Sequence, residues 1–168
     1  MNQPLRIQIP TAQPSPPAAN QEDRIGREDR AALVCCHEPA YVEFLTTQLR
    51  AGGYKVHHAL THQAGVQKLA GRSYHLTVLL ENLEGCYLDS NGLLRHLTTL
   101  STDERRATFV VLLCQSFATG DEFNAYAQSV DLLINYSDVG QFNALVAPAM
   151  EEHTEGNRHF DSILRKAA

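Results

Sequence analysis

The chain has 168 residues, of which 43% are hydrophobic and 20% are charged, a length and composition that fit one globular domain with peripheral segments. Its net charge of −5 gives no general attraction to nucleic acid or to an anionic membrane. No apolar run approaches the roughly 20 residues of a membrane span, and the first residues lack the charged-then-apolar pattern of a signal peptide. We therefore expect a cytoplasmic protein that binds neither nucleic acid nor membrane.

The first 30 residues differ in composition from the rest of the chain. They are polar and rich in proline, and a charged run closes them. This composition predicts an extended or disordered arm over residues 1–30. Within it, the alternation of residues 5–9 is the pattern of an edge strand that ends before Pro10.

Regular patterning begins at Ala31. The apolar run 31–36 is typical of a strand buried on both faces. Pro39 opens a helix, and residues 54–60 form a more polar strand of edge character. Thr61 is a suitable N-cap for the next helix, which Gly71 ends.

The second half repeats the same alternation. Apolar runs predict strands at 74–80, 108–114 and 131–135. A leucine-rich helix is expected near 93–100, and a weaker helix near 120–129. Five strands that alternate with helices indicate a doubly wound parallel α/β sheet. The strand order 2-1-3-4-5 is one common solution, and spacing leaves other orders open.

The last helix begins near Asp138, and Pro148 is expected to kink or interrupt it. A polar stretch follows, and then a short amphipathic segment with Phe160, Ile163 and Leu164. This segment either packs on its own domain or docks on a partner or a second copy.

The ends of the predicted strands resemble those of bacterial response-regulator receiver domains. Leu33–Pro39 is similar to the first receiver strand with the start of its helix, and Tyr74–Leu80 to the third strand. Val110–Cys114 and Asp131–Tyr136 are similar to the fourth and fifth. The resemblance implies a CheY-like fold with strand order 2-1-3-4-5 and an extended C-terminal helix. It also implies three parts, which are the arm 1–30, a receiver-like domain 31–152 and a helical extension 153–168.

Receiver chemistry does not follow from the resemblance. Phosphorylation requires an acidic pair that helps to bind Mg²⁺, an aspartate acceptor, a hydroxyl and a lysine. The resemblance places Cys36 and His37 at the acidic pair, Leu80 at the acceptor, Cys114 at the hydroxyl and Asn135 at the lysine. All five positions have lost the required group. The resemblance therefore implies a pseudo-receiver that is not an enzyme and uses no cofactor.

Glu81 provides a second possible alignment. A slip of one residue would place Glu81 at the acceptor position, where a glutamate imitates a phosphorylated aspartate. Strand alternation argues against the slip, because it moves the side chain to the other face of the sheet. Neither alignment supplies a hydroxyl or a lysine to sense the charge.

The expected function is that of a non-catalytic signalling or scaffold module that binds a protein partner or a second copy. Receivers signal through the face of their fourth helix, fifth strand and fifth helix, so the resemblance places the contact there or on the C-terminal helix. The interaction face would comprise Phe123, Tyr126, Tyr136, Val139, Phe142 and Val146.

The alternative is a ligand- or metal-binding sensor that reuses the former phosphate pocket through Cys36, His37, Cys114 and Asn135. A zinc site needs about four ligands, and no ligand spacing of that kind occurs, so no metal is assigned.

Other reactive residues are interpreted without a functional role. His57, His58 and His62 are expected on the surface, and the Arg105-Arg106 pair in a solvated loop.

Overall fold

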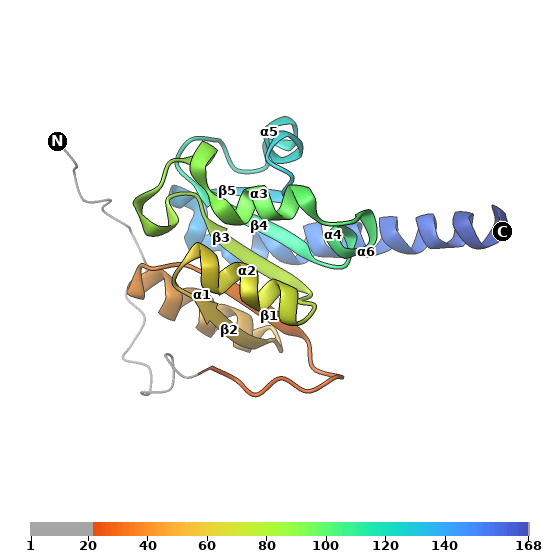
Figure 1. The fold of residues 1–168 in the computed structure, drawn as a ribbon, viewed down its shortest axis with the longest axis horizontal. Helices are drawn as coiled ribbons and strands as arrows, with labels where there is room; N and C mark the ends of the chain where they lie inside the picture. The colour runs from red at the N-terminus through yellow and green to blue at the C-terminus, as the bar shows by residue number, and fades with distance from the viewer. Residues whose placement is uncertain (1–21, 168) are drawn as a thin grey trace.

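The computed structural model describes residues 22–167, which form a five-stranded, all-parallel sheet of order β2-β1-β3-β4-β5 (Figure 1). This confirms the expected fold class and strand order. Each strand lies within its predicted run and is one or two residues shorter than that run. They are β1 (Ala31–Cys35), β2 (Lys55–Ala59), β3 (Leu76–Leu80), β4 (Phe109–Cys114) and β5 (Leu132–Asn135). The strand expected at residues 5–9 lies outside the described residues.

Helices cover both faces of the sheet, as a doubly wound fold requires. One face packs against α1 and α6, and the other against α2, α3 and α5. Short 3₁₀ turns connect several elements. The helical elements are α1 (Pro39–Ala51), α2 (His62–Gly71), η1 (Leu83–Gly85), η2 (Leu88–Ser90), α3 (Gly92–Thr99), α4 (Thr102–Arg106), α5 (Glu122–Ala127), η3 (Tyr136–Gln141) and α6 (Phe142–Ala167).

Local capping fixes the starts of the helices that follow β2 and β3. The Thr61 side chain accepts the Ala64 amide at 3.1 Å, which confirms it as the N-cap of α2. Asn91 caps α3, and its side-chain amide also donates to the Leu80 carbonyl at 3.2 Å. Because Asn91 is buried, these bonds tie the start of α3 to the end of β3.

The last part of the N-terminal arm is bonded to edge strand β2. The Asp23 amide donates to the Val56 carbonyl at 3.2 Å, and the Asp23 carboxylate accepts the Val56 amide at 2.8 Å. Arg50 of α1 binds the same carboxylate at 3.0 Å. Contacts between the arm and the domain are therefore present from residues 22 and 23 onward, before a bend at residues 27–29.

We expect Asp23→Ala to lower the free energy of unfolding by about 1 kcal/mol, because the exposed edge of β2 loses a charged acceptor. Burial by itself raises the pKa of Asp23, but the bonds from Arg50 and the Val56 amide outweigh it and leave that pKa lowered. A lowered carboxyl pKa stabilises the fold above the unfolded value of about 3.9 and stops doing so as the pH falls. Urea unfolding at several pH values should show that the variant has a lower free energy of unfolding than the wild type at pH 7 but not in acid. A loss of stability that is independent of pH would contradict this account, and Glu28→Ala, which removes an exposed carboxylate from the same segment, is the control.

Helix α6 runs without a break from Phe142 to Ala167, so the predicted interruption at Pro148 is wrong. Proline removes one backbone bond, but packing holds the helix on both sides of it. Before Pro148, Phe142 and Val146 are buried in the core. After it, Asn157 donates to the Arg106 carbonyl at 3.1 Å. The helix thus crosses the expected boundary at residue 152, and its last turns project beyond the sheet (Figure 1).

The Arg105-Arg106 pair lies in helix α4 and not in the expected solvated loop. Ser101 and Glu104 form a capping box that starts this helix. Arg105 binds Asp131 at 2.9 Å, and the guanidinium of Arg106 lies 4.0 Å from the ring centre of Phe160. Helix α4 therefore anchors the middle of α6 to the domain.

Candidate functional site at the carboxyl edge of the sheet

The residue predicted to stand at the acceptor position is part of the core. Leu80 is the last residue of β3, lies opposite Leu113 of β4 and is 1% exposed. Its side chain belongs to the cluster between the sheet and helices α1 and α6. A leucine in this place provides no acceptor carboxylate.

The two cysteines of the former pocket are protonated thiols on opposite faces of the sheet. Cys36 packs on the α1 side and Cys114 on the α2 side. Burial raises the pKa of Cys36 to about 12 and that of Cys114 to about 11. Each thiol is engaged with a carbonyl, Cys36 with Glu38 at 3.7 Å and Cys114 with Phe117 at 3.8 Å. Without a bound cation, both thiols are therefore protonated at neutral pH.

Asn135, at the lysine position, holds two loops together. Its side-chain amide donates to the Phe117 carbonyl at 2.9 Å, and its side-chain oxygen accepts the Ser137 amide at 3.1 Å. The group therefore orders the loop after β4 and starts η3. It carries no charge that could bind a phosphoryl group. His37, the second residue of the former acidic pair, lies 3.5 Å from Glu38 and is partly exposed.

Tyr136 crosses the carboxyl edge of the sheet. Its hydroxyl donates to the side-chain oxygen of Asn82 at 3.2 Å, and its ring centre lies 5.7 Å from that of Tyr41. Asn82 follows β3, and Tyr136 follows β5, so the side chain spans the end of β4 between them. Burial, together with the nearby Glu81 carboxylate, raises the pKa of Tyr136 and keeps the phenol neutral.

Glu81 is the first residue beyond β3 and links the ends of two strands. Its carboxylate accepts the Gln115 amide at 2.8 Å, and its own amide donates to the Leu113 carbonyl at 2.9 Å. The negative charge adds to the burial that raises the pKa of Cys114. Glu81 is thus the one carboxylate in the predicted pocket, and one of its oxygens already accepts a backbone amide of the loop after β4. The six predicted pocket residues are Cys36, His37, Leu80, Glu81, Cys114 and Asn135.

The structure divides the expected interaction face in two. Phe123 and Tyr126 of α5 are 80% and 87% exposed. Val139, Phe142 and Val146 are buried in the core beside α1, so they cannot contact a partner and are corrected to core residues. Their helical spacing fits a core face as well as an interface. Whether Phe123 and Tyr126 form an interface stays a prediction.

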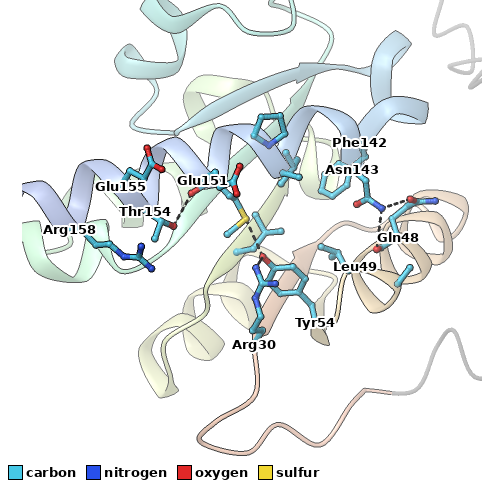
Figure 2. A pocket seen from close by; sticks show the side chains of 17 residues that line it. Arg30, Gln48, Leu49, Tyr54, Phe142, Asn143, Glu151, Thr154, Glu155 and Arg158 are labelled. Carbon is cyan, nitrogen blue, oxygen red and sulfur yellow. Dashed lines mark hydrogen bonds between the residues drawn. The ribbon is translucent and has the colours of Figure 1, made fainter.

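A cavity of about 790 Å³ lies at the opposite, amino edge of the sheet, between α1 and α6 (Figure 2). Arg30 donates to the Tyr54 hydroxyl at 2.6 Å, and that hydroxyl donates to the Met150 sulfur at 3.2 Å. Asn143 binds the Gln48 side chain at 2.6 Å on the other wall. These polar groups bond to one another and tie α6 to the domain.

Sequence analysis missed a cluster of three reactive side chains. His62 lies 2.7 Å from Glu84 through Nδ1 and 3.5 Å from the sulfur of Cys86 through Nε2. The residues come from the loops after β2 and β3, so no local spacing could reveal them. Within residues 22–167, no three His, Cys, Asp or Glu side chains are arranged to hold a metal ion. The metal-binding alternative therefore has no support in that part of the chain.

Comparisons with solved structures agree with the fold. A response regulator from Burkholderia pseudomallei with a phosphorylated aspartate is 17% identical, with 76% of this chain and 73% of that chain covered and a TM-score of 0.53. The signal receiver domain of an HD-domain protein from Pseudomonas fluorescens is 15% identical, with 80% and 96% covered and a TM-score of 0.58. A fusion to a trimeric coiled-coil segment of yeast Spc42 is 20% identical, with 85% and 95% covered and a TM-score of 0.60.

The chain therefore has the fold of a response-regulator receiver (CheY-like) domain. The sequence matches no protein-family model and no curated protein. In the described part of the chain, no helix is both long enough and apolar enough to cross a membrane.

Proposed function

We propose that this protein is a pseudo-receiver, a signalling or scaffold module that works by protein–protein contact without phosphorylation. The observation that carries the proposal is the burial of Leu80 in the core at the position of the acceptor aspartate. Without a carboxylate there, no acyl-phosphate can form. The proposal includes a cytoplasmic location and no catalytic activity.

The rest of the carboxyl edge supports the same proposal. Cys36 stands at the acidic pair as a protonated thiol, which is a poor ligand for Mg²⁺. The amide of Asn135 is used to order loops, and Tyr136 lies across the edge in contact with Asn82. In place of a switch that responds to phosphate, hydrogen bonds join the loops after β3, β4 and β5 to one another.

Two exposed apolar surfaces are candidates for the contact. The first is on α5, where Phe123 and Tyr126 are largely exposed. The second is on the projecting part of α6, where Phe160, Ile163 and Leu164 are 44%, 50% and 52% exposed. Large apolar side chains grouped on a surface favour protein interfaces.

The projecting end of α6 has an apolar face. Ile163 and Leu164 follow Phe160 by three and four residues, so the three side chains lie on the same side of the helix. The Arg106 guanidinium stacks on the Phe160 ring at 4.0 Å, which leaves Ile163 and Leu164 as the more exposed part of this face. This end of α6 is the element that would assemble with a second copy or another protein.

The test measures the molar mass of the full chain in solution, and its complex with any partner that co-purifies from the native cell, with and without beryllofluoride and Mg²⁺. We expect one assembly that beryllofluoride leaves unchanged. Ile163→Ser with Leu164→Ser should dissociate it if α6 is the contact, and Phe123→Ser with Tyr126→Ser if α5 is. Because these side chains lie outside the core, both variants should fold.

Two results would contradict the proposal. The first is a set of amide NMR shifts centred on Leu80 and Glu81 when beryllofluoride and Mg²⁺ are added, since that requires a working acceptor site. The second is a monomer at all concentrations that retains no partner from its native cell. Asp89→Ala, in the loop after β3, is a control for the effect of changing an exposed residue.

A further inference from the structure

The cluster of His62, Glu84 and Cys86 lies outside the former phosphate pocket. His62 is the first residue of α2, and Glu84 and Cys86 belong to the loop that joins β3 to α3. The two segments adjoin because α2 packs on α3, where a side chain added at Gly92 would lie 3.4 Å from His62. The Glu84 backbone has a φ of 57°, a conformation that non-glycine residues seldom adopt. This turn places the Glu84 carboxylate on His62.

The imidazole uses its two nitrogens in opposite directions. Nδ1 lies 2.7 Å from a Glu84 oxygen, which also accepts the His62 backbone amide at 2.7 Å. Nε2 lies 3.5 Å from the sulfur of Cys86. With the proton on Nδ1 donated to Glu84, the lone pair of Nε2 points to the thiol. A nucleophile, a base and a carboxylate that orients the base stand here in the order that activated-thiol sites use.

Cys86 differs from the other three cysteines in accessibility. Cys35, Cys36 and Cys114 are buried, whereas Cys86 is partly exposed. Burial of each of those three sulfurs also raises its pKa well above that of a free thiol. Cys86 is therefore the cysteine that a dissolved reagent can reach.

We propose that Cys86 is a reactive thiol that hydroperoxides oxidise, with His62 as its base and Glu84 as the residue that positions His62. The sulfur attacks the terminal peroxide oxygen, an S–O bond forms and the O–O bond breaks. The thiol proton passes to Nε2 of His62 and from there to the leaving oxygen. A thiol and a hydroperoxide thus give a sulfenic acid and an alcohol, or water when the oxidant is hydrogen peroxide.

The environment of the sulfur explains both the base and the choice of electrophile. Partial burial raises the pKa of the Cys86 thiol, so at neutral pH its proton must be removed during the reaction. The partly exposed sulfur is accessible to a small electrophile such as hydrogen peroxide. Oxidation of Cys86 would modify the protein covalently, and this reaction does not depend on whether the module functions without phosphorylation.

The experiment treats the full reduced chain with hydrogen peroxide and dimedone at neutral pH and maps the adduct by mass spectrometry. We expect the sulfenic-acid adduct on Cys86. His62→Ala should lower the rate constant at least about tenfold, and added imidazole should restore part of it. Glu84→Gln keeps an acceptor for the His62 amide, so it should slow the reaction while the melting temperature changes little.

Three results would overturn the proposal. They are adducts spread evenly over the four cysteines, a His62→Ala protein that reacts at the wild-type rate, and a slowed His62→Ala protein that imidazole does not restore. Imidazole replaces the missing base but not a packing contact, so the last result would assign His62 a structural role alone. Cys86→Ser controls for reaction at the other thiols, and intact unfolding curves verify that each variant is folded.

Discussion

Leu80→Asp is expected to destabilise this domain strongly and not to create a phosphorylation site. Leu80 is 1% exposed and packs between the sheet and helices α1 and α6, where an aspartate would find no described partner. A buried, unpaired carboxylate together with the lost apolar contacts costs about 4 kcal/mol or more. That is a large part of the roughly 5–15 kcal/mol that typically stabilises a domain of this kind. Urea unfolding followed by far-ultraviolet circular dichroism measures the loss.

Two matched substitutions separate the parts of this effect. Leu80→Ala removes the side chain without adding charge and should cost about 2–4 kcal/mol. Glu81→Asp keeps a carboxylate at the partly exposed edge, one residue further along, and should cost about 1 kcal/mol. A Leu80→Asp protein that folds with wild-type stability and takes up phosphate from acetyl phosphate would show that our placement of Leu80 in the core is wrong.

Asp131→Ala is expected to lower the free energy of unfolding by about 2–3 kcal/mol. The Asp131 carboxylate accepts the Val110 amide at 2.7 Å and the Arg105 guanidinium at 2.9 Å, and it lies 3.6 Å from His153 of α6. Its removal leaves an amide of β4 and the Arg105 cation without this acceptor, and each charge-assisted bond contributes about 1.5–3 kcal/mol. Amide hydrogen exchange should also increase in α6 around His153.

Asp131→Asn is the matched control, because its side-chain oxygen can still accept the Val110 amide while the charge is lost. It should cost about half as much as alanine. If the two variants lose equal stability, the charge and not the bond to Val110 dominates. If neither loses any, Asp131 does not connect β4 to helices α4 and α6 as described.

Most of the fold follows from patterns that are local in sequence. The buried strands are almost entirely apolar runs, with Thr77 of β3 as a polar residue within one of them, and Thr61 is a capping residue just before a helix. Pro148 misled because packing on both sides keeps α6 continuous, and that packing is not visible in the sequence. Helix α4 was missed because it has five residues and no apolar face. Its capping box of Ser101 and Glu104 was a signal that could have revealed it.

The candidate site was less predictable, for physical reasons. The proposed loss of receiver groups could be inferred from sequence because it depends only on which residue ends each strand. The contact of Tyr136 with Asn82 depends on how two loops fold over the sheet edge. The contact of His62 with Glu84 depends on left-handed backbone at Glu84, where the sequence shows only the glycine that follows. The apolar spacing along α6 is the same for a core face and for an interface, which is why Phe142 was misassigned.

The segment 22–30 has a consequence for how the sheet can be approached. Strand β2 is an outer strand, and such a strand can add an extended peptide through its free backbone groups. Asp23 occupies both the amide and the carbonyl of Val56, and the Glu22 carboxylate accepts the His58 amide at 3.1 Å. A protein that approaches this side of the sheet would contact the charged side chains of Glu22 and Asp23, which already bond to backbone groups of β2. A chain shortened to begin at Ala31 would instead present β2 as a template for other chains.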